Sequence, residues 1–267
     1  METLSPEMSV VVAFGAVFIL VAIVMTVRRL TDAESQPLAA TMVSAPTVIR
    51  NVQISFTSYR KGRAVVIDSE TTGFSPRAGD RMVSFAAIEL QDGIPTGQQQ
   101  SFVFNPMRKC PAAARRVHGL TDKYLSIQEP FSARAPQIAD FVDGSVIVGH
   151  NVSFDLGFLE SELALCRLRL SRNPTKCTME MFKAAYPMER KSLDNACARL
   201  GIDASLRAVH HGALIDAALC MAVFQLLTDP SFPNCTYSRL ASFAPPSNEA
   251  VPKLGRPRKK RPQPGGA

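Results

Sequence analysis

Apolar residues recur along residues 63–228 with the two periods that distinguish strands from helices. Short runs rich in Val and Ile predict strands, and longer segments with apolar residues three or four apart predict helices. The predicted strands are 64–68, 81–91, 98–104 and 145–149, and the predicted helices are 111–117, 132–142, 153–168, 192–200 and 211–227. A hairpin followed by helices that alternate with a short strand predicts an α/β domain with a mixed central sheet.

Local signals predict where several of these elements turn or end. Residues 92–97 are expected to form the hairpin turn. Ser132 is expected to cap the helix that follows it. Another helix is expected to open at Ser192-Leu193 and to stop at Gly201.

A long apolar segment stands near the start of the chain, at residues 8–27. Twenty helical residues span roughly 30 Å, the thickness of a bilayer's hydrocarbon core. Acidic residues precede the segment, whereas Arg28 and Arg29 follow it, so the positive-inside rule predicts that the rest of the chain lies in the cytoplasm. We predict a single-pass membrane anchor; a cleaved signal peptide and a later translation start, which would leave the protein cytoplasmic and soluble, are the alternatives.

Composition divides the remainder of the chain. The predicted division is an anchor at 1–29, a linker at 30–62, a domain at 63–228 and a proline-rich basic tail at 229–267. The net charge is +7, and the tail holds six basic residues and no acidic one after residue 251, so the rest of the chain is nearly neutral. This asymmetry predicts an anionic partner for the tail.

The six cysteines show no C-x-x-C pairing and no short regular spacing. We therefore predict free thiols in a reducing compartment, without a disulfide framework or a zinc site.

Two carboxylates, Asp68 and Glu70, directly follow the apolar run at residues 65–67. Alternation along a strand places residues i and i+2 on the same face, so both carboxylates point the same way. Their mutual repulsion and desolvation would be relieved by a cation, and oxygen ligands suit Mg²⁺ or Mn²⁺. The alternative is a strand that simply ends in a polar turn made by Thr71, Thr72 and Gly73.

Two further carboxylates stand near predicted helix starts. Asp155 falls in the first turn of the helix after strand 145–149, where it either serves a ligand site or only complements the helix amino terminus. Asp216 lies among apolar residues, a costly environment for an unpaired charge. His211 is five residues earlier, a rotation of about 140° on a regular helix, so it is expected at or before the helix start. Its alternative role is that of an ordinary capping or core histidine.

Three motifs, taken together, resemble those of the DnaQ-like (DEDDh) 3′→5′ exonucleases. They are Asp68-x-Glu70-Thr71-Thr72-Gly73, His150-Asn151-x-x-Phe154-Asp155 and His211-x4-Asp216. The connecting segments Asn105-Pro106, Val117-His118-Gly119-Leu120-Thr121-Asp122 and Ser192-Leu193-Asp194 are most similar to the proofreading (epsilon) subunits of bacterial DNA polymerase III. Three motifs in register are far more specific than any one of them.

The resemblance implies an RNase H-like fold, a mixed central sheet flanked by helices, with two divalent metal ions, Mg²⁺ or Mn²⁺. Asp68 would bridge both ions, Glu70 and Asp216 would complete the first site, and Asp155 would hold the second. His211 would be the general base. The implied reaction is phosphodiester hydrolysis at the 3′ end of DNA, with release of nucleoside monophosphates.

The resemblance also assigns residues around the ions. The backbone of residues 71–73 would approach the terminal nucleotide, and Phe74 either stacks on the terminal base or belongs to the core. His118 and Asn151 match family positions and are expected to support the site without binding metal. His150 is expected to end its strand.

The tail segment Gly255-Arg256-Pro257-Arg258-Lys259-Lys260-Arg261-Pro262 resembles an AT-hook. Such a segment lays arginines in the minor groove of A·T-rich DNA, whereas a generic basic tail binds phosphates or anionic lipid without sequence choice. The predicted contacts with DNA come from Arg256, Arg258, Lys259, Lys260 and Arg261.

The partners predicted for the whole chain are DNA 3′ ends and, through residues 8–27, a membrane. The short proline-rich segment after residue 228 argues against docking on a DNA polymerase. The alternative functions are an RNA exonuclease similar to RNase T or oligoribonuclease, and a non-catalytic membrane-tethered DNA-binding protein.

Overall fold

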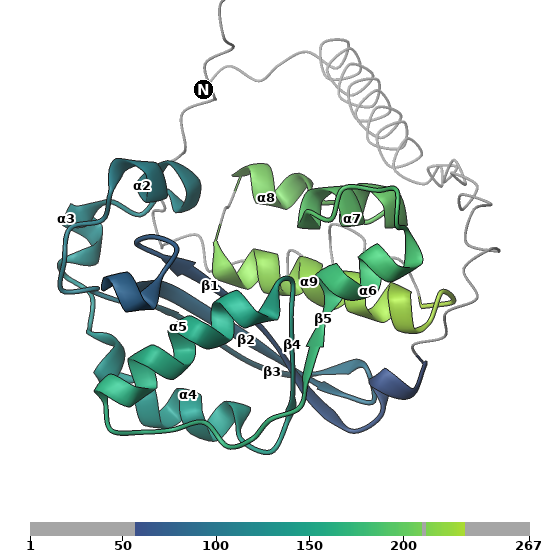
Figure 1. The fold of residues 1–267 in the computed structure, drawn as a ribbon, viewed down its shortest axis with the longest axis horizontal. Helices are drawn as coiled ribbons and strands as arrows, with labels where there is room; N and C mark the ends of the chain where they lie inside the picture. The colour runs from purple at the N-terminus through teal and green to yellow at the C-terminus, as the bar shows by residue number, and fades with distance from the viewer. Residues whose placement is uncertain (1–56, 210–211, 233–267) are drawn as a thin grey trace, which may run out of the picture. The chain divides into compact units, whose positions relative to one another are not determined.

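A mixed five-stranded sheet in the order β3-β2-β1-β4-β5 forms the centre of the computed structural model, which describes residues 57–209 and 212–232 (Figure 1). The strands are β1 (Arg63–Thr71), β2 (Met82–Gln91), β3 (Ile94–Val103), β4 (Val146–Gly149) and β5 (Thr175–Cys177). β1 is antiparallel to β2 and parallel to β4, which in turn is parallel to β5. The predicted mixed sheet is confirmed.

Helices cover both faces of the sheet, because alternate residues of β1 are apolar on both sides. Ala64 and Val66 pack with α6 (Thr178–Ala185), α7 (Leu193–Leu200) and α9 (Ala213–Thr228). Val65 and Ile67 pack against the other layer, α4 (Ala135–Val142) and α5 (Val152–Leu165) (Figure 1). All residues of α9 are buried, which explains why this helix is apolar all round.

The short elements lie around this three-layered core. They are the 3₁₀ helices η2 (Thr57–Arg60), η3 (Pro76–Ala78) and η4 (Phe131–Ala133), and the α-helices α2 (Ala112–His118), α3 (Asp122–Leu125) and α8 (Ser205–Val209). Neither β5 nor helices α3, α6 and α8 were predicted, because these segments lack a long apolar period.

Two local predictions are wrong. The hairpin turn is not 92–97 but a two-residue turn at Asp92 and Gly93, whose φ values of 52° and 80° match the type I′ geometry of tight hairpins. Ser132 does not cap a helix, since it lies inside η4 and α4 begins only at Ala135. Pro136 explains the later start, because proline has no N–H to donate to residue 132 and is tolerated in a first helical turn.

Other local predictions are confirmed. The Ser192 side chain accepts a hydrogen bond from the Asn195 N–H at the start of α7, and Gly201 ends that helix with a φ of 71°. The five described cysteines are free, as expected. Residues 57–60, which the prediction placed in the linker, pack on the domain: Tyr59 contacts the α9 side of the core, and Arg60 forms an ion pair with Asp229.

No helix within residues 57–209 and 212–232 is long and apolar enough to cross a membrane. The predicted anchor at 8–27 and the AT-hook-like tail segment at 255–262 both lie outside the described residues. Membrane attachment and tail binding therefore stay predictions.

Candidate active site

Three carboxylates meet at one end of the sheet. Asp68 and Glu70 come from the last part of β1, and Asp216 comes from the first turn of α9. One oxygen of each lies within 4.8 Å of the other two, so the shared orientation predicted for Asp68 and Glu70 is confirmed. Glu70 and Asp216 are buried, with exposures of 8% and 5%.

The sheet topology explains this location. β1 pairs with β4 only over residues 64–66, so Asp68 and Glu70 project past the carboxyl end of that parallel pair. In α/β proteins, ligands bind at this edge. The helix carrying Asp216 begins at Ala213, not at residue 211 as predicted, so Asp216 lies in its first turn and faces the same edge.

Asp155 approaches from the opposite helical layer. It lies in the first turn of α5, is only 4% exposed, and accepts a 2.6 Å hydrogen bond from the Ser69 hydroxyl. Burial raises the pKa of Asp155 to about 7, although its hydrogen bonds with Ser69 lower it. Asp155 is therefore harder to ionise than an ordinary aspartate, and a cation bound nearby would favour its charged form.

The pKa of Asp68 is raised well above its ordinary value. Desolvation of the site is the largest cause, and the charges of Asp155, Asp216 and Glu70 raise it further, whereas Arg207 lowers it. The four carboxylates lie close together in a poorly hydrated site and offer only oxygen atoms as metal ligands. Such ligands match the preference of Mg²⁺ and Mn²⁺. The residues present thus fit a hard divalent ion.

Sequence reasoning missed Arg207, which contacts one of the three grouped carboxylates. Its Nε donates to Asp216 Oδ1 at 2.7 Å and its Nη2 donates to Asp216 Oδ2 at 2.9 Å, while its Nη1 donates to Asp194. A single arginine in the short segment between two predicted helices has no distinguishing sequence pattern.

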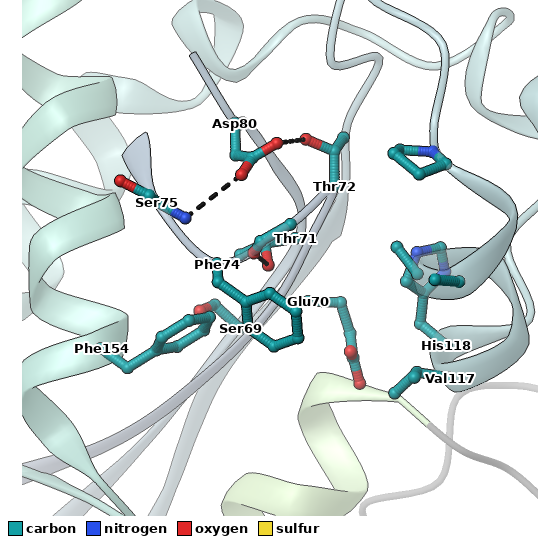
Figure 2. A pocket seen from close by; sticks show the side chains of 14 residues that line it. Ser69, Glu70, Thr71, Thr72, Phe74, Ser75, Asp80, Val117, His118 and Phe154 are labelled. Atoms are coloured by element: carbon teal, nitrogen blue, oxygen red, sulfur yellow. Dashed lines mark hydrogen bonds between the residues drawn. The ribbon is translucent and has the colours of Figure 1, made fainter. Parts of the chain in front are cut away.

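A cavity of about 590 Å³ adjoins the acidic group (Figure 2). Glu70 belongs to the acidic group and also lines the cavity. Phe74 and Phe154 stand on one side of Glu70, with Val117 and His118 on the other. Phe74 is 91% exposed, so its alternative role as a core aromatic is wrong. The cavity offers exposed apolar surfaces within reach of an acidic centre.

Asp80 holds the loop that carries Phe74. Its carboxylate accepts a hydrogen bond from the Thr72 hydroxyl and another from the Ser75 N–H, both at 3.2 Å (Figure 2). A Cβ on Gly73 would lie 2.3 Å from Asp80 Oδ2, so only glycine allows this close approach.

The remaining motif residues have separate places. His118 is buried in the cavity wall, where its Nδ1 accepts a hydrogen bond from the Leu120 N–H at 3.0 Å. Asn151 is exposed at the N-cap of α5 with a left-handed φ of 74°, and its side chain makes no cap hydrogen bond. His150 follows β4, as predicted, and its Nε2 lies 2.8 Å from the Lys191 carbonyl oxygen.

His211 lies outside the described residues. Its role as a general base stays a prediction.

Comparison with known proteins identifies the family to which the chain belongs. The RNase T family model, described as Exonuclease, matches residues 65–224, and the chain belongs to this exonuclease family. It is a DnaQ-like 3′→5′ exonuclease that resembles the epsilon subunits of DNA polymerase III, as the motifs indicated.

Individual relatives define the extent of the similarity. The chain is 36% identical to DNA polymerase III subunit epsilon of Rickettsia felis over 170 residues, which cover 62% of this chain and 74% of that protein. It is 32% identical to the same subunit of Escherichia coli K12 over 174 residues, which cover 62% of this chain and 71% of that protein. The zinc-bound complex of Escherichia coli exonuclease I with single-stranded DNA is 21% identical, with a TM-score of 0.57, and the match covers 68% of this chain and 42% of that one. This last likeness shows a shared fold.

Proposed function

We propose that this exonuclease removes nucleoside monophosphates from the 3′ end of DNA with two divalent metal ions and His211 as the general base. The observation that carries the proposal is the group formed by Asp68, Glu70 and Asp216, which adjoins a cavity through Glu70. Such an arrangement can hold a cation and a chain end side by side.

The acidic residues would share the ions between them. Asp68, Glu70 and Asp216 would hold one ion and Asp155 would join Asp68 at the other; when bound, the ions activate water and stabilise the leaving 3′ oxygen. The imidazole of His211 would accept a proton from the attacking water, because histidine titrates near neutral pH.

The cavity residues would position the terminal nucleotide. Thr71, Thr72 and Gly73 line the cavity, so their backbone would approach a nucleotide bound there. Phe74 and Phe154 offer aromatic surfaces, and base stacking on such surfaces tolerates every base. A single-stranded 3′ end is therefore the substrate that this cavity fits best.

DNA is favoured over RNA by the relatives. The Rickettsia and Escherichia proteins are named as subunits of a DNA polymerase, and the exonuclease I structure contains single-stranded DNA. The basic tail would add phosphate contacts outside the catalytic domain.

The test uses full-length protein with 5′-labelled single-stranded DNA and RNA of the same sequence, in Mg²⁺, Mn²⁺ or EDTA. Shortening of DNA from the 3′ end in either metal, and none in EDTA, is expected. Asp68→Asn is expected to abolish shortening, and His211→Ala is expected to slow it by about 10²–10⁴-fold, the usual contribution of a general base. Asp140→Asn, an exposed position on α4, is the matched control.

The outcomes separate the parts of the proposal. A preference for RNA would refute the DNA assignment alone, and undiminished activity in EDTA would refute the metal mechanism. A normal rate for His211→Ala would remove the histidine from its role as base.

A further inference from the structure

The guanidinium of Arg207 joins two carboxylates of unlike exposure. Its two parallel hydrogen bonds to Asp216 measure 2.7 and 2.9 Å, and its third nitrogen pairs with Asp194. The side chain of Asp216 is 7% exposed, that of Arg207 is 23% exposed, and that of Asp194 is 65% exposed. The chain of ion pairs therefore runs from the surface to the buried acidic centre.

These three residues belong to three successive helices. Asp194 lies in the first turn of α7, Arg207 in α8, and Asp216 in the first turn of α9. Arg207 and Asp216 thus precede and follow His211 in the sequence. Asp194 ends the segment Ser192-Leu193-Asp194, which the sequence analysis singled out without assigning it a role.

The paired geometry fixes the plane of the Asp216 carboxylate. A guanidinium that donates two parallel hydrogen bonds restricts the rotation of its partner, which a lysine ammonium cannot do. With this pair formed, Asp216 already presents an oxygen within 4.8 Å of oxygens of Asp68 and Glu70. Asp216 therefore has an orientation suited to a metal ligand while it is paired with Arg207.

Binding of a cation does not require this ion pair to break. An ionised carboxylate has about four lone-pair sites on its two oxygens, and Arg207 uses only two of them. The ion pair also reduces the cost of keeping Asp216 charged among the apolar residues of α9.

We propose that Arg207 is a positioning residue that holds Asp216 in the orientation of a metal ligand, and that Asp194 orients Arg207. The inference rests on the proposed metal site, since it concerns one of the proposed ligands. It assigns no direct contact between Arg207 and the substrate.

The test measures Mn²⁺ binding to full-length protein by electron paramagnetic resonance, without nucleic acid. Arg207→Gln removes the charge and the paired geometry, and we expect it to weaken Mn²⁺ binding at least tenfold. Arg207→Lys keeps the charge but loses the second parallel bond, so its affinity is expected between those of Arg207→Gln and the wild type. Asp194→Asn is expected to weaken binding by a smaller factor than Arg207→Gln.

A second readout separates positioning from a general loss of stability. In the DNA shortening assay, Arg207→Gln is expected to need a higher Mg²⁺ concentration for half its maximal rate, with much of the rate restored at saturating Mg²⁺. Arg134→Gln is the matched control, because Arg134 also pairs with a carboxylate, Glu129, but on the surface. Melting temperatures identify any variant that fails to fold. If Arg207→Gln fails to fold, the Mn²⁺ affinity of Arg207→Lys is compared with that of the wild type and decides the test.

Two results would overturn the inference. Unchanged Mn²⁺ affinity in both Arg207 variants would show that Asp216 needs no such partner. Tighter Mn²⁺ binding in Arg207→Gln would show that the arginine competes with the ion. A wild type that binds no Mn²⁺ would refute the proposed metal site on which the inference rests, whereas either of these two results, obtained with a wild type that binds Mn²⁺, refutes the inference alone.

Discussion

Replacing Asp155 by asparagine would measure how much a buried carboxylate of the acidic centre destabilises the metal-free protein. Asp155 is 4% exposed, and burial raises its pKa to about 7 from an ordinary value of 3.8. Between these pKa values the folded state binds the proton more tightly than the unfolded state, so metal-free protein loses stability as the pH rises through this window. Above pH 7 the loss is complete, and at about 1.4 kcal/mol per pKa unit it amounts to at most about 4 kcal/mol.

Asp155→Asn keeps the size of the side chain and still accepts the hydrogen bond from Ser69, but it cannot ionise. In EDTA at pH 8 we expect the variant to be more stable than the wild type by up to about 4 kcal/mol. The difference is expected to shrink toward zero by pH 4, where Asp155 of the folded wild type is protonated. Saturating Mg²⁺ is expected to reduce or reverse the difference, because only the wild type keeps Asp155 for the second proposed ion and so gains more stability from bound Mg²⁺ than the variant does.

The assay is urea unfolding followed by circular dichroism at pH 4, 6 and 8, with EDTA or with Mg²⁺. Asp140→Asn, on the exposed side of α4, is the control for loss of a charge and is expected to follow the wild type. The reasoning is refuted if Asp155→Asn is less stable than the wild type in EDTA at pH 8, or if the difference between them is the same at every pH.

Four further predictions address the fold, the cavity and the chain's amino-terminal segment. Glu162→Gln should lower the free energy of unfolding by about 1–3 kcal/mol, because buried Glu162 accepts two hydrogen bonds from Arg81; an unchanged urea midpoint would contradict it. Gly73→Ala should reduce kcat/KM by about tenfold or more, with little change in melting temperature, because the added methyl group would displace the loop and small misplacements at a reacting centre are costly. A normal kcat/KM would show that activity does not require the close approach of Asp80 to Gly73. Phe74→Ala should weaken the binding of single-stranded DNA in EDTA by about 1–3 kcal/mol, calculated from the measured Kd, whereas Phe74→Tyr should not. Equal losses of binding free energy in both variants would argue against stacking. Residues 8–27 should place full-length protein in the membrane fraction, and recovery in the soluble fraction would favour the later translation start.

Several features could be predicted from short stretches of sequence because their causes are local. The alternation along a strand was enough to place Asp68 and Glu70 on one face, and that placement is confirmed. The start of α7 after Ser192 and its end at Gly201 depend on interactions within a few residues and were also predicted correctly. The hairpin turn could have been shortened by the same kind of reasoning, since Asp92-Gly93 is a strong signal for a two-residue turn.

Other features could not be assigned from local patterns. The helix α9 is apolar on every side, so its sequence has no polar face to show its orientation or its first residue. Phe74 could have been a core residue or a surface one, and only the folded loop shows that it is exposed.

The sequence by itself determined the family, the mixed sheet and the acidic residues, since motif order and short-range periodicity are written along the chain. Only the tertiary structure decided how those acids meet: Asp155 and Asp216 reach β1 from helices on opposite faces of the sheet. It alone revealed Arg207 against Asp216, and the raised pKa of Asp155. The physical reason is that ion pairing and desolvation depend on distances through space, which local patterns do not specify.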